Sequence, residues 1–228
     1  MENTVVLTSE YWPKGSVIPI RSESHERIKE AGTPILVKDL NYHEINESDT
    51  DDFNNLIQEC FPNDFKAASH LKKDPNILLL GCYWRPPGAS REILVGNIIV
   101  FTKKLVRWFD HTLAYDKAKL KLLQCSHALK FLSNIKTYYG VHIMIVGVIQ
   151  EARRMGIASE LIRQSTRIVI ERYKDVVVES LRVLASAEGA IKAYEKLGFK
   201  HVLTNMDFYA PSYPTTEAKF YIIPLPKC

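Results

Sequence analysis

Hydrophobic residues along this chain gather in short runs, and amphipathic stretches separate these runs. Runs rich in Ile, Val, Leu and aromatic residues are typical of buried strands, whereas apolar positions spaced three and four residues apart indicate helices. The runs predict strands at residues 35–40, 76–84, 92–101, 141–149, 176–185, 200–209 and 218–225. The strands at 76–84 and 92–101 flank the segment RPPGASR, which contains the Pro and Gly typical of a hairpin connection, so we expect them to pair.

The amphipathic stretches predict helices between these strands. They cover residues 50–60, 157–173 and 187–198. The polar stretch NESDTDD offers an N-cap to the first of these helices, and Gly198 offers a C-cap to the last. Residues 103–138 form a long insertion whose spaced leucines also suggest a helix. The order of elements predicts an α/β fold in which helices cover both faces of a mixed sheet.

Composition narrows the class of protein without naming an activity. A chain of 228 residues fits one large domain, and we expect that domain at 34–228, after an irregular N-terminal extension at 1–33 that is rich in Pro, Gly and polar residues. The 46% hydrophobic and 25% charged fractions are ordinary for a globular protein. The net charge of +4 comes from mixed signs, which argues against a nucleic-acid partner and leaves small anionic ligands open.

The cysteine spacing and the N-terminal sequence limit the metal sites and the cellular compartments that we expect for this chain. The four cysteines lie far apart without the spacing of zinc ligands, so we expect no metal. The N-terminus lacks the pattern of a secretory signal, and no run approaches the length of a spanning helix. We therefore expect a cytoplasmic protein with no transmembrane segment, with the nucleus or the periphery of a membrane as alternatives.

The stretch RRMGIA, from Arg153 to Ala158, directly follows the apolar strand 141–149 and precedes a helix. A helix N-terminus has unpaired N–H groups and partial positive charge, and Gly156 would let an anion approach them. Arg153 and Arg154 would add charged donors. The alternative is an ordinary turn with solvated arginines, and a short glycine motif alone does not decide between the two.

A second motif follows about thirty residues later, where Ala190, Tyr194, Gly198 and Phe199 form the pattern A-x-x-x-Y-x-x-x-G-F. This pattern and R-x-x-G-x-A at 153–158 resemble the two signature segments of the GNAT acetyltransferases. The resemblance extends in element order over about 34–225. It implies the GNAT fold, which is α/β with a mixed, mostly antiparallel sheet and helices on both faces. Within that superfamily the chain looks most like the N-terminal protein acetyltransferases of the Golgi-associated type.

The resemblance implies acetyl-CoA as cosubstrate and no metal. The strand before the turn would lie along the pantetheine and acetyl group, and the amides of the turn would take the pyrophosphate. The cofactor-binding residues implied are Met144, Ile145, Val146, Val148, Ala152, Arg153, Arg154, Met155, Gly156, Ile157, Ala158 and Tyr194.

Two residues would carry the chemistry that the resemblance implies. Tyr194 matches the tyrosine that protonates the departing thiolate, unless it is simply a core aromatic. His142 matches a tyrosine that helps deprotonate the amine, and a histidine of ordinary pKa near 6.5 would be well poised for this role. The alternative for His142 is a buried ring bonded to backbone. Arg182 replaces the second base of the family, and since arginine cannot serve as a base we expect it to bind an acidic part of the substrate.

An apolar slot for the first residue of a peptide would complete the site. The aromatic and proline landmarks that predict it are Phe61, Pro62, Phe65, Phe208 and Tyr209, although each could equally be an ordinary core residue. The expected partner is therefore a protein or peptide N-terminus that begins with Met. A small-molecule or lysine N-acetyltransferase and a non-catalytic acetyl-CoA-binding module are the alternatives.

Overall fold

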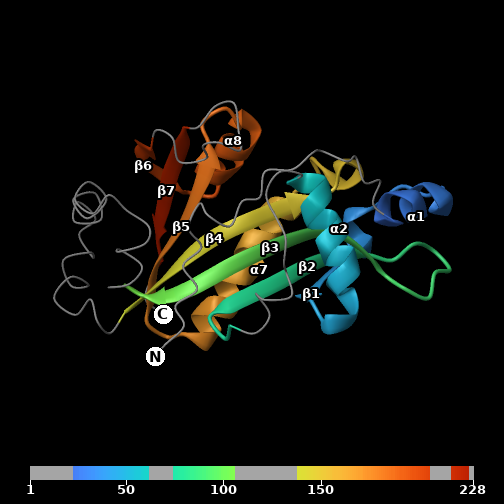
Figure 1. Ribbon diagram of the computed structural model, residues 1–228, viewed down its shortest axis with the longest axis horizontal. Coiled ribbons are helices and arrows are strands. Elements are labelled where there is room, and N and C mark those ends of the chain that lie inside the picture. Colours follow the sequence, from blue (N-terminus) through green and yellow to red (C-terminus); the bar gives the residue numbers. More distant parts are fainter. Residues whose placement is uncertain (1–22, 62–73, 106–137, 206–216, 226–228) are drawn as a thin grey trace.

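One sheet organises the residues that the computed structural model describes, which are 23–61, 74–105, 138–205 and 217–225. Its strands are β1 (Leu40–Glu44), β2 (Ile77–Trp84), β3 (Ile93–Lys104), β4 (Tyr139–Val148), β5 (Val176–Leu184), β6 (Lys200–Asn205) and β7 (Ala218–Pro224). They lie in the order β1-β2-β3-β4-β5-β7-β6 (Figure 1). Only β4 and β5 run parallel, and the other neighbours are antiparallel. This confirms the expected mixed, mostly antiparallel sheet and the β2–β3 hairpin.

Helices cover both faces of the sheet, as expected. The α-helices are α1 (Glu23–Ala31), α2 (Thr50–Cys60), α7 (Ile157–Arg172) and α8 (Glu188–Lys196), and the short 3₁₀ turns are η2 (Val37–Asp39), η3 (Glu47–Asp49) and η4 (Gln150–Ala152). A Cβ added at Gly96 of β3 would contact Ile157 and Leu161 of α7, whereas one added at Gly147 of β4 would contact Leu56 of α2. Helices α2 and α7 therefore lie on opposite faces (Figure 1).

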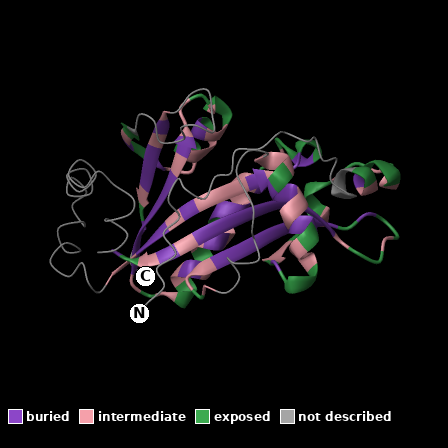
Figure 2. Ribbon diagram, in the orientation of Figure 1, coloured by how far each residue is buried: buried purple, intermediate pink, exposed green. Residues whose placement is uncertain are grey.

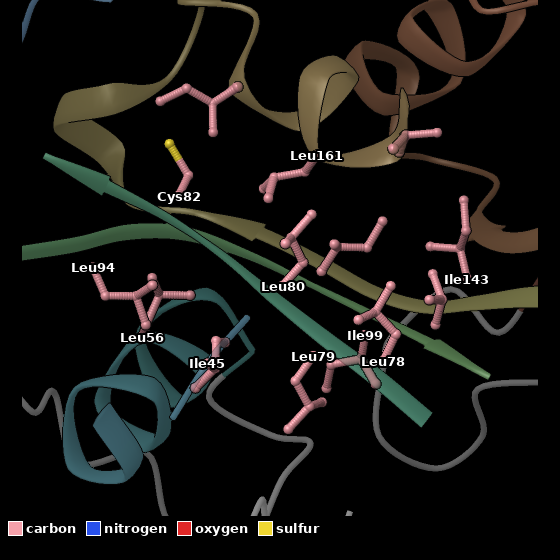
Figure 3. Packing of buried hydrophobic residues seen from close by; sticks show 14 of the residues in the cluster. Ile45, Leu56, Leu78, Leu79, Leu80, Cys82, Leu94, Ile99, Ile143 and Leu161 are labelled. Carbon is pink, nitrogen blue, oxygen red and sulfur yellow. The ribbon is translucent and has the colours of Figure 1, made fainter. Parts of the chain in front are cut away.

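The core lies between the sheet and these helices. Strands β2 and β3 are buried along nearly their whole length, because α2 covers one face and α7 the other (Figure 2). This double cover explains why their sequences are continuous apolar runs and do not alternate. Figure 3 shows Leu56 on one side of the strands and Leu161 on the other.

Two expectations about the N-terminal region are wrong. The strand predicted at 35–40 lies instead at Leu40–Glu44, because Leu36 and Val37 are 43% and 61% exposed and lead into η2. Residues 23–31 are helical, although we expected an irregular segment up to residue 33. The sequence ESHERIKEA contains no Pro or Gly, and Ile28 is buried where α1 packs against α2 and β3.

The other expected helices lie close to their predicted bounds. The expected helix at 103–138 falls mostly on residues 106–137, outside the described residues. Gly198 ends α8 as expected, with a φ of 98° and its N–H bonded to Glu195 O. The polar stretch before α2 forms a capping box in which the backbone N–H of Asn46 donates to Asp49 Oδ2.

A β-bulge interrupts the pairing of β4 with β3. Ile99 pairs with Ile145 and Val100 pairs with Ile143, so Met144 is an extra residue without a partner of its own. A bulge bends a strand and increases its twist. The bend therefore falls in the middle of β4.

Beyond this bulge β4 and β5 stop pairing. Their last paired residues are Ile143 and Leu181, although β4 continues to Val148 and β5 continues to Leu184. Figure 1 shows the two strands diverging, with α8 following β5. Among the described residues, the part of β4 from Met144 onward thus has a partner strand on its β3 side only.

Candidate active site

The turn from Arg153 to Gly156 connects η4 at the end of β4 to the N-terminus of α7. Two residues in it have left-handed backbone, Arg154 with a φ of 69° and Gly156 with a φ of 83°. Gly156 is the N-cap of α7 and supplies no side chain to bond the first helical amides. A side chain at this φ would be strained, which is why glycine suits the position.

The amides of this turn divide into two groups. Ala152 N–H donates to Ile149 O and Arg153 N–H donates to Gln150 O. These two amides are therefore not free to bind pyrophosphate, although we expected all the amides of 152–158 to take part. The amides of residues 154–159 have no backbone acceptor within the described parts of the chain. Consecutive unpaired N–H groups at a helix N-terminus attract an anion.

Arg153 and Arg154 are both exposed but differ in their contacts. Arg153 Nε donates to Val148 O at 3.1 Å, and the guanidinium also lies beside the Cys60 thiol. Burial raises the pKa of that thiol to about 11, which keeps it neutral. Arg153 therefore ties the turn to the end of β4 and to α2, a role in positioning that its sequence motif did not predict.

His142 lies on β4 directly opposite Ser180 of β5. Its Nδ1 is 2.9 Å from Ser180 Oγ. Burial, with the positive charges of Arg182 and Lys103, lowers the pKa of His142 to about 3. The expectation of a pKa near 6.5 is thus wrong, because the ring is desolvated among cations. His142 is neutral at pH 7, so it can accept a hydrogen bond, but it is a weak base.

Tyr194 lies on α8 and packs edge-on against Phe199, with 6.1 Å between the ring centroids. Burial raises its pKa to about 12. The phenol is therefore protonated at neutral pH, as a proton donor must be. No described residue is hydrogen-bonded to its hydroxyl.

The residues expected to hold substrate are only partly within the described chain. Arg182 lies on β5 two residues after Ser180, and its guanidinium carbon is 5.5 Å from the centre of the Phe220 ring on β7. Phe61 is half-buried at the C-cap of α2. The other expected slot residues, Pro62, Phe65, Phe208 and Tyr209, lie outside the described residues.

Two polar residues that we did not single out lie buried in β5. Ser180 is fully buried and contacts His142, and Glu179 is 2% exposed and points to the other face, where its Oε2 is 2.8 Å from Thr166 Oγ1 of α7. Burial raises the pKa of Glu179 to about 8. The sequence feature that could have predicted these two buried residues is the adjacent polar pair Glu-Ser within the largely apolar strand VVVESLRVL.

Two kinds of site are absent from the described residues, a metal-ligand cluster and a membrane-spanning helix. No group of three or more His, Cys, Asp or Glu side chains is placed there to hold a metal ion. Of the helices described, none combines the length and the apolar character needed to cross a bilayer.

Comparison with known proteins gives one family match. Residues 125–199 match the Acetyltransferase (GNAT) family. An N-alpha-acetyltransferase of Sulfurisphaera tokodaii is 36% identical over 69 residues, which is 30% of this chain and 41% of that protein. The chain therefore spans less than half the length of this curated relative.

Solved structures match over most of the described fold. NAA60 of Arabidopsis thaliana, in complex with a bisubstrate analogue, is 19% identical, with a TM-score of 0.64 over 82% of this chain and 99% of that one. Naa50 of the same plant, in complex with the bisubstrate analogue CoA-Ac-MVNAL, is 17% identical, with a TM-score of 0.55 over 81% and 98%. The chain has the fold of these proteins, and the fold and the family match together support the GNAT acetyltransferase superfamily.

Proposed function

We propose that this chain, with its GNAT fold and GNAT family segment, transfers the acetyl group of acetyl-CoA to the α-amine of a protein N-terminus. One observation carries the proposal. Within the described parts of the chain, the edge of β4 that has no partner on its β5 side leads through η4 to amides without a backbone acceptor at the N-terminus of α7. The first can hydrogen-bond the amide-bearing arm of acetyl-CoA, and the second can bind its pyrophosphate. The relative from Sulfurisphaera tokodaii, named an N-alpha-acetyltransferase, supports this choice of amine.

In the proposed reaction the neutral amine attacks the thioester carbonyl directly. A carbon–nitrogen bond forms, the carbon–sulfur bond of the tetrahedral intermediate breaks, and the electron pair leaves on the CoA sulfur. Tyr194 donates its proton to that sulfur, and its pKa of about 12 ensures that the proton is present at neutral pH. His142 accepts a hydrogen bond from the amine, directly or through one water molecule, and thereby orients the nitrogen lone pair. The nitrogen becomes cationic when the carbon–nitrogen bond forms, and it then loses one proton to water. The Tyr194 phenolate regains its proton from water.

The low pKa of His142 favours an α-amine as substrate. At pH 7.4 roughly a quarter of an α-amine of pKa 7.8 is already neutral, whereas only about 0.1% of a lysine amine is. A base of pKa about 3 gives little help in removing a proton from an ammonium group, so the substrate itself must supply the neutral amine. This argument favours a protein N-terminus over a lysine side chain.

The finer proposal is a substrate that begins with Met, in the manner of the Golgi-associated N-terminal acetyltransferases. The half-buried Phe61, with Pro62, Phe65, Phe208 and Tyr209 outside the described residues, would form the apolar slot. Arg182, whose guanidinium lies over the Phe220 ring, would meet an acidic group further along the substrate. In Naa50 of Arabidopsis thaliana the bound analogue carries the sequence MVNAL.

A CoA-release assay tests the proposal. The panel contains a Met-starting peptide with one internal lysine, the same peptide with a blocked α-amine, and a polyamine. We expect release with the first substrate and a large loss with the second. Release driven by the blocked peptide or by the polyamine would favour a lysine or small-molecule acetyltransferase. Calorimetric binding of acetyl-CoA without release by any amine would favour a non-catalytic module.

A further inference from the structure

Ser180 lies in the short parallel pairing between β4 and β5, one residue before the last pair. Its side chain is fully buried, and its Oγ lies between two groups of β4. One is the carbonyl oxygen of Val141, at 3.1 Å, and the other is Nδ1 of His142, at 2.9 Å. Both contacts are within hydrogen-bond distance, so the hydroxyl serves both at once.

The chemistry of these three groups fixes where the protons lie. A serine hydroxyl has one proton and two lone pairs, and a carbonyl oxygen can only accept. The Ser180 proton must therefore go to Val141 O, and the bond to His142 forms only if Nδ1 carries a proton and donates it to Oγ. A neutral imidazole has one N–H, so the other nitrogen, Nε2, is then the one with the lone pair.

We propose that Ser180 is a positioning residue that holds His142 as the Nδ1–H tautomer, so that the Nε2 lone pair is presented to the substrate amine. The first half of this statement stands on the hydrogen bonds alone. The second half rests on the proposed function, in which His142 meets the amine.

The charged groups around the ring explain why a hydroxyl suits this place. Arg182, two residues beyond Ser180, and Lys103, two residues beyond the cross-strand partner of His142 on β3, both act on the ring as positive charges. Glu179 is adjacent in β5, but its carboxyl contacts Thr166 of α7 on the opposite face. Among the described residues, Ser180 is thus the hydrogen-bonding partner of the ring, and it orients the imidazole without a negative charge that would favour its protonated form.

Nitrogen NMR tests the tautomer directly. The full chain is labelled with ¹⁵N-histidine, and the His142 signals among the seven histidines are assigned by their loss in His142→Gln. At neutral pH we expect a protonated Nδ1 and an unprotonated Nε2. A wild-type protein with Nε2 protonated instead would overturn the proposal, and this measurement needs no variant of Ser180 to fold.

Removing the Ser180 hydroxyl should weaken the preference of His142 for the Nδ1–H tautomer. In Ser180→Ala the ratio of Nδ1–H to Nε2–H should fall about three- to tenfold, the equivalent of one hydrogen bond. Ser165→Ala is the matched control, because Ser165 is equally buried but donates to Ile162 O within α7. It should leave the His142 signals unchanged. An unchanged ratio in Ser180→Ala would refute the positioning role.

Kinetics then connect the tautomer to the proposed reaction. We expect Ser180→Ala to lower kcat about three- to tenfold with little change in the affinity for acetyl-CoA, and Ser165→Ala to leave both unchanged. Normal kcat in a Ser180→Ala protein whose tautomer has shifted would refute the second half of the proposal. A wild-type chain with the expected tautomer but no transferase activity would instead remove the proposed function and leave the tautomer assignment in place.

Discussion

Replacing Glu179 with Gln should stabilise the protein, and should do so more strongly as the pH rises. Thr166 Oγ1 is 2.7 Å from Ile162 O and 2.8 Å from Glu179 Oε2, but the threonine hydroxyl has one proton. Since the Ile162 carbonyl can only accept, both contacts are hydrogen bonds when Glu179 is protonated and donates to Thr166. The other carboxyl oxygen has no partner among the described residues.

The magnitude follows from the pKa of the buried carboxyl. In the unfolded chain Glu179 ionises near its ordinary pKa of 4.5, whereas in the folded protein burial raises the pKa to about 8. Its contribution to stability is therefore fully present below pH 4.5, is lost progressively as the pH rises to 8, and stays lost above that. At about 1.4 kcal/mol per pKa unit, the free energy of unfolding falls by on the order of 5 kcal/mol across this window.

The assay is urea unfolding between pH 5 and pH 9, monitored by circular dichroism. Gln keeps the shape and remains neutral, so the free energy of unfolding of Glu179→Gln should exceed that of the wild type by an amount that grows up to about pH 8. Glu188→Gln is the control, because that side chain is 82% exposed and should give no such trend. A difference between wild type and Glu179→Gln that is the same at every pH would refute the reasoning.

Three further substitutions test the site and its support. Gly156→Ala should weaken acetyl-CoA binding in calorimetry, because a left-handed φ of 83° costs a side chain about 1–2 kcal/mol. Gly189→Ala is the control, since φ is not positive there and a Cβ meets nothing within 4 Å. An affinity of Gly156→Ala equal to that of the wild type would contradict pyrophosphate binding at this turn. Tyr194→Phe should lower kcat about 10²-fold or more with acetyl-CoA affinity nearly unchanged, as measured by CoA release, and wild-type kcat would exclude the phenol as proton donor. Gly147→Ala should lower the midpoint of urea unfolding, since its Cβ would lie 2.7 Å from Asn97 Oδ1 and overpacking typically costs about 1–3 kcal/mol; an unchanged midpoint would contradict this.

The sequence predicted most of the sheet because burial on both faces leaves a strong signal. Strands such as β2 and β3 are continuous apolar runs, and a run of that kind admits few other structures. The first strand was misplaced because Leu36 and Val37 are apolar but exposed, and the composition of a short run does not report its environment.

The candidate site was predictable only as far as local motifs extend. Gly156 and its turn are specified by neighbouring residues, so their backbone conformation follows from the local sequence. The contact between His142 and Ser180 joins residues 38 positions apart and depends on the register of two parallel strands, which no local pattern encodes. The bulge at Met144 is equally hidden, since a bulged methionine and a paired one look alike within an apolar run.

The unpartnered edge of β4 has a consequence for solubility. An exposed strand edge offers hydrogen bonds to any extended chain and is therefore a route to aggregation. Among the described residues, the edge that begins at Met144 has no partner strand on its β5 side, and Arg153 covers only its far end, through the bond to Val148 O. If acetyl-CoA occupies this edge as proposed, the cosubstrate also shields it from other polypeptides and stabilises the folded state by mass action. Bound acetyl-CoA would then protect the protein that uses it from aggregation through this edge.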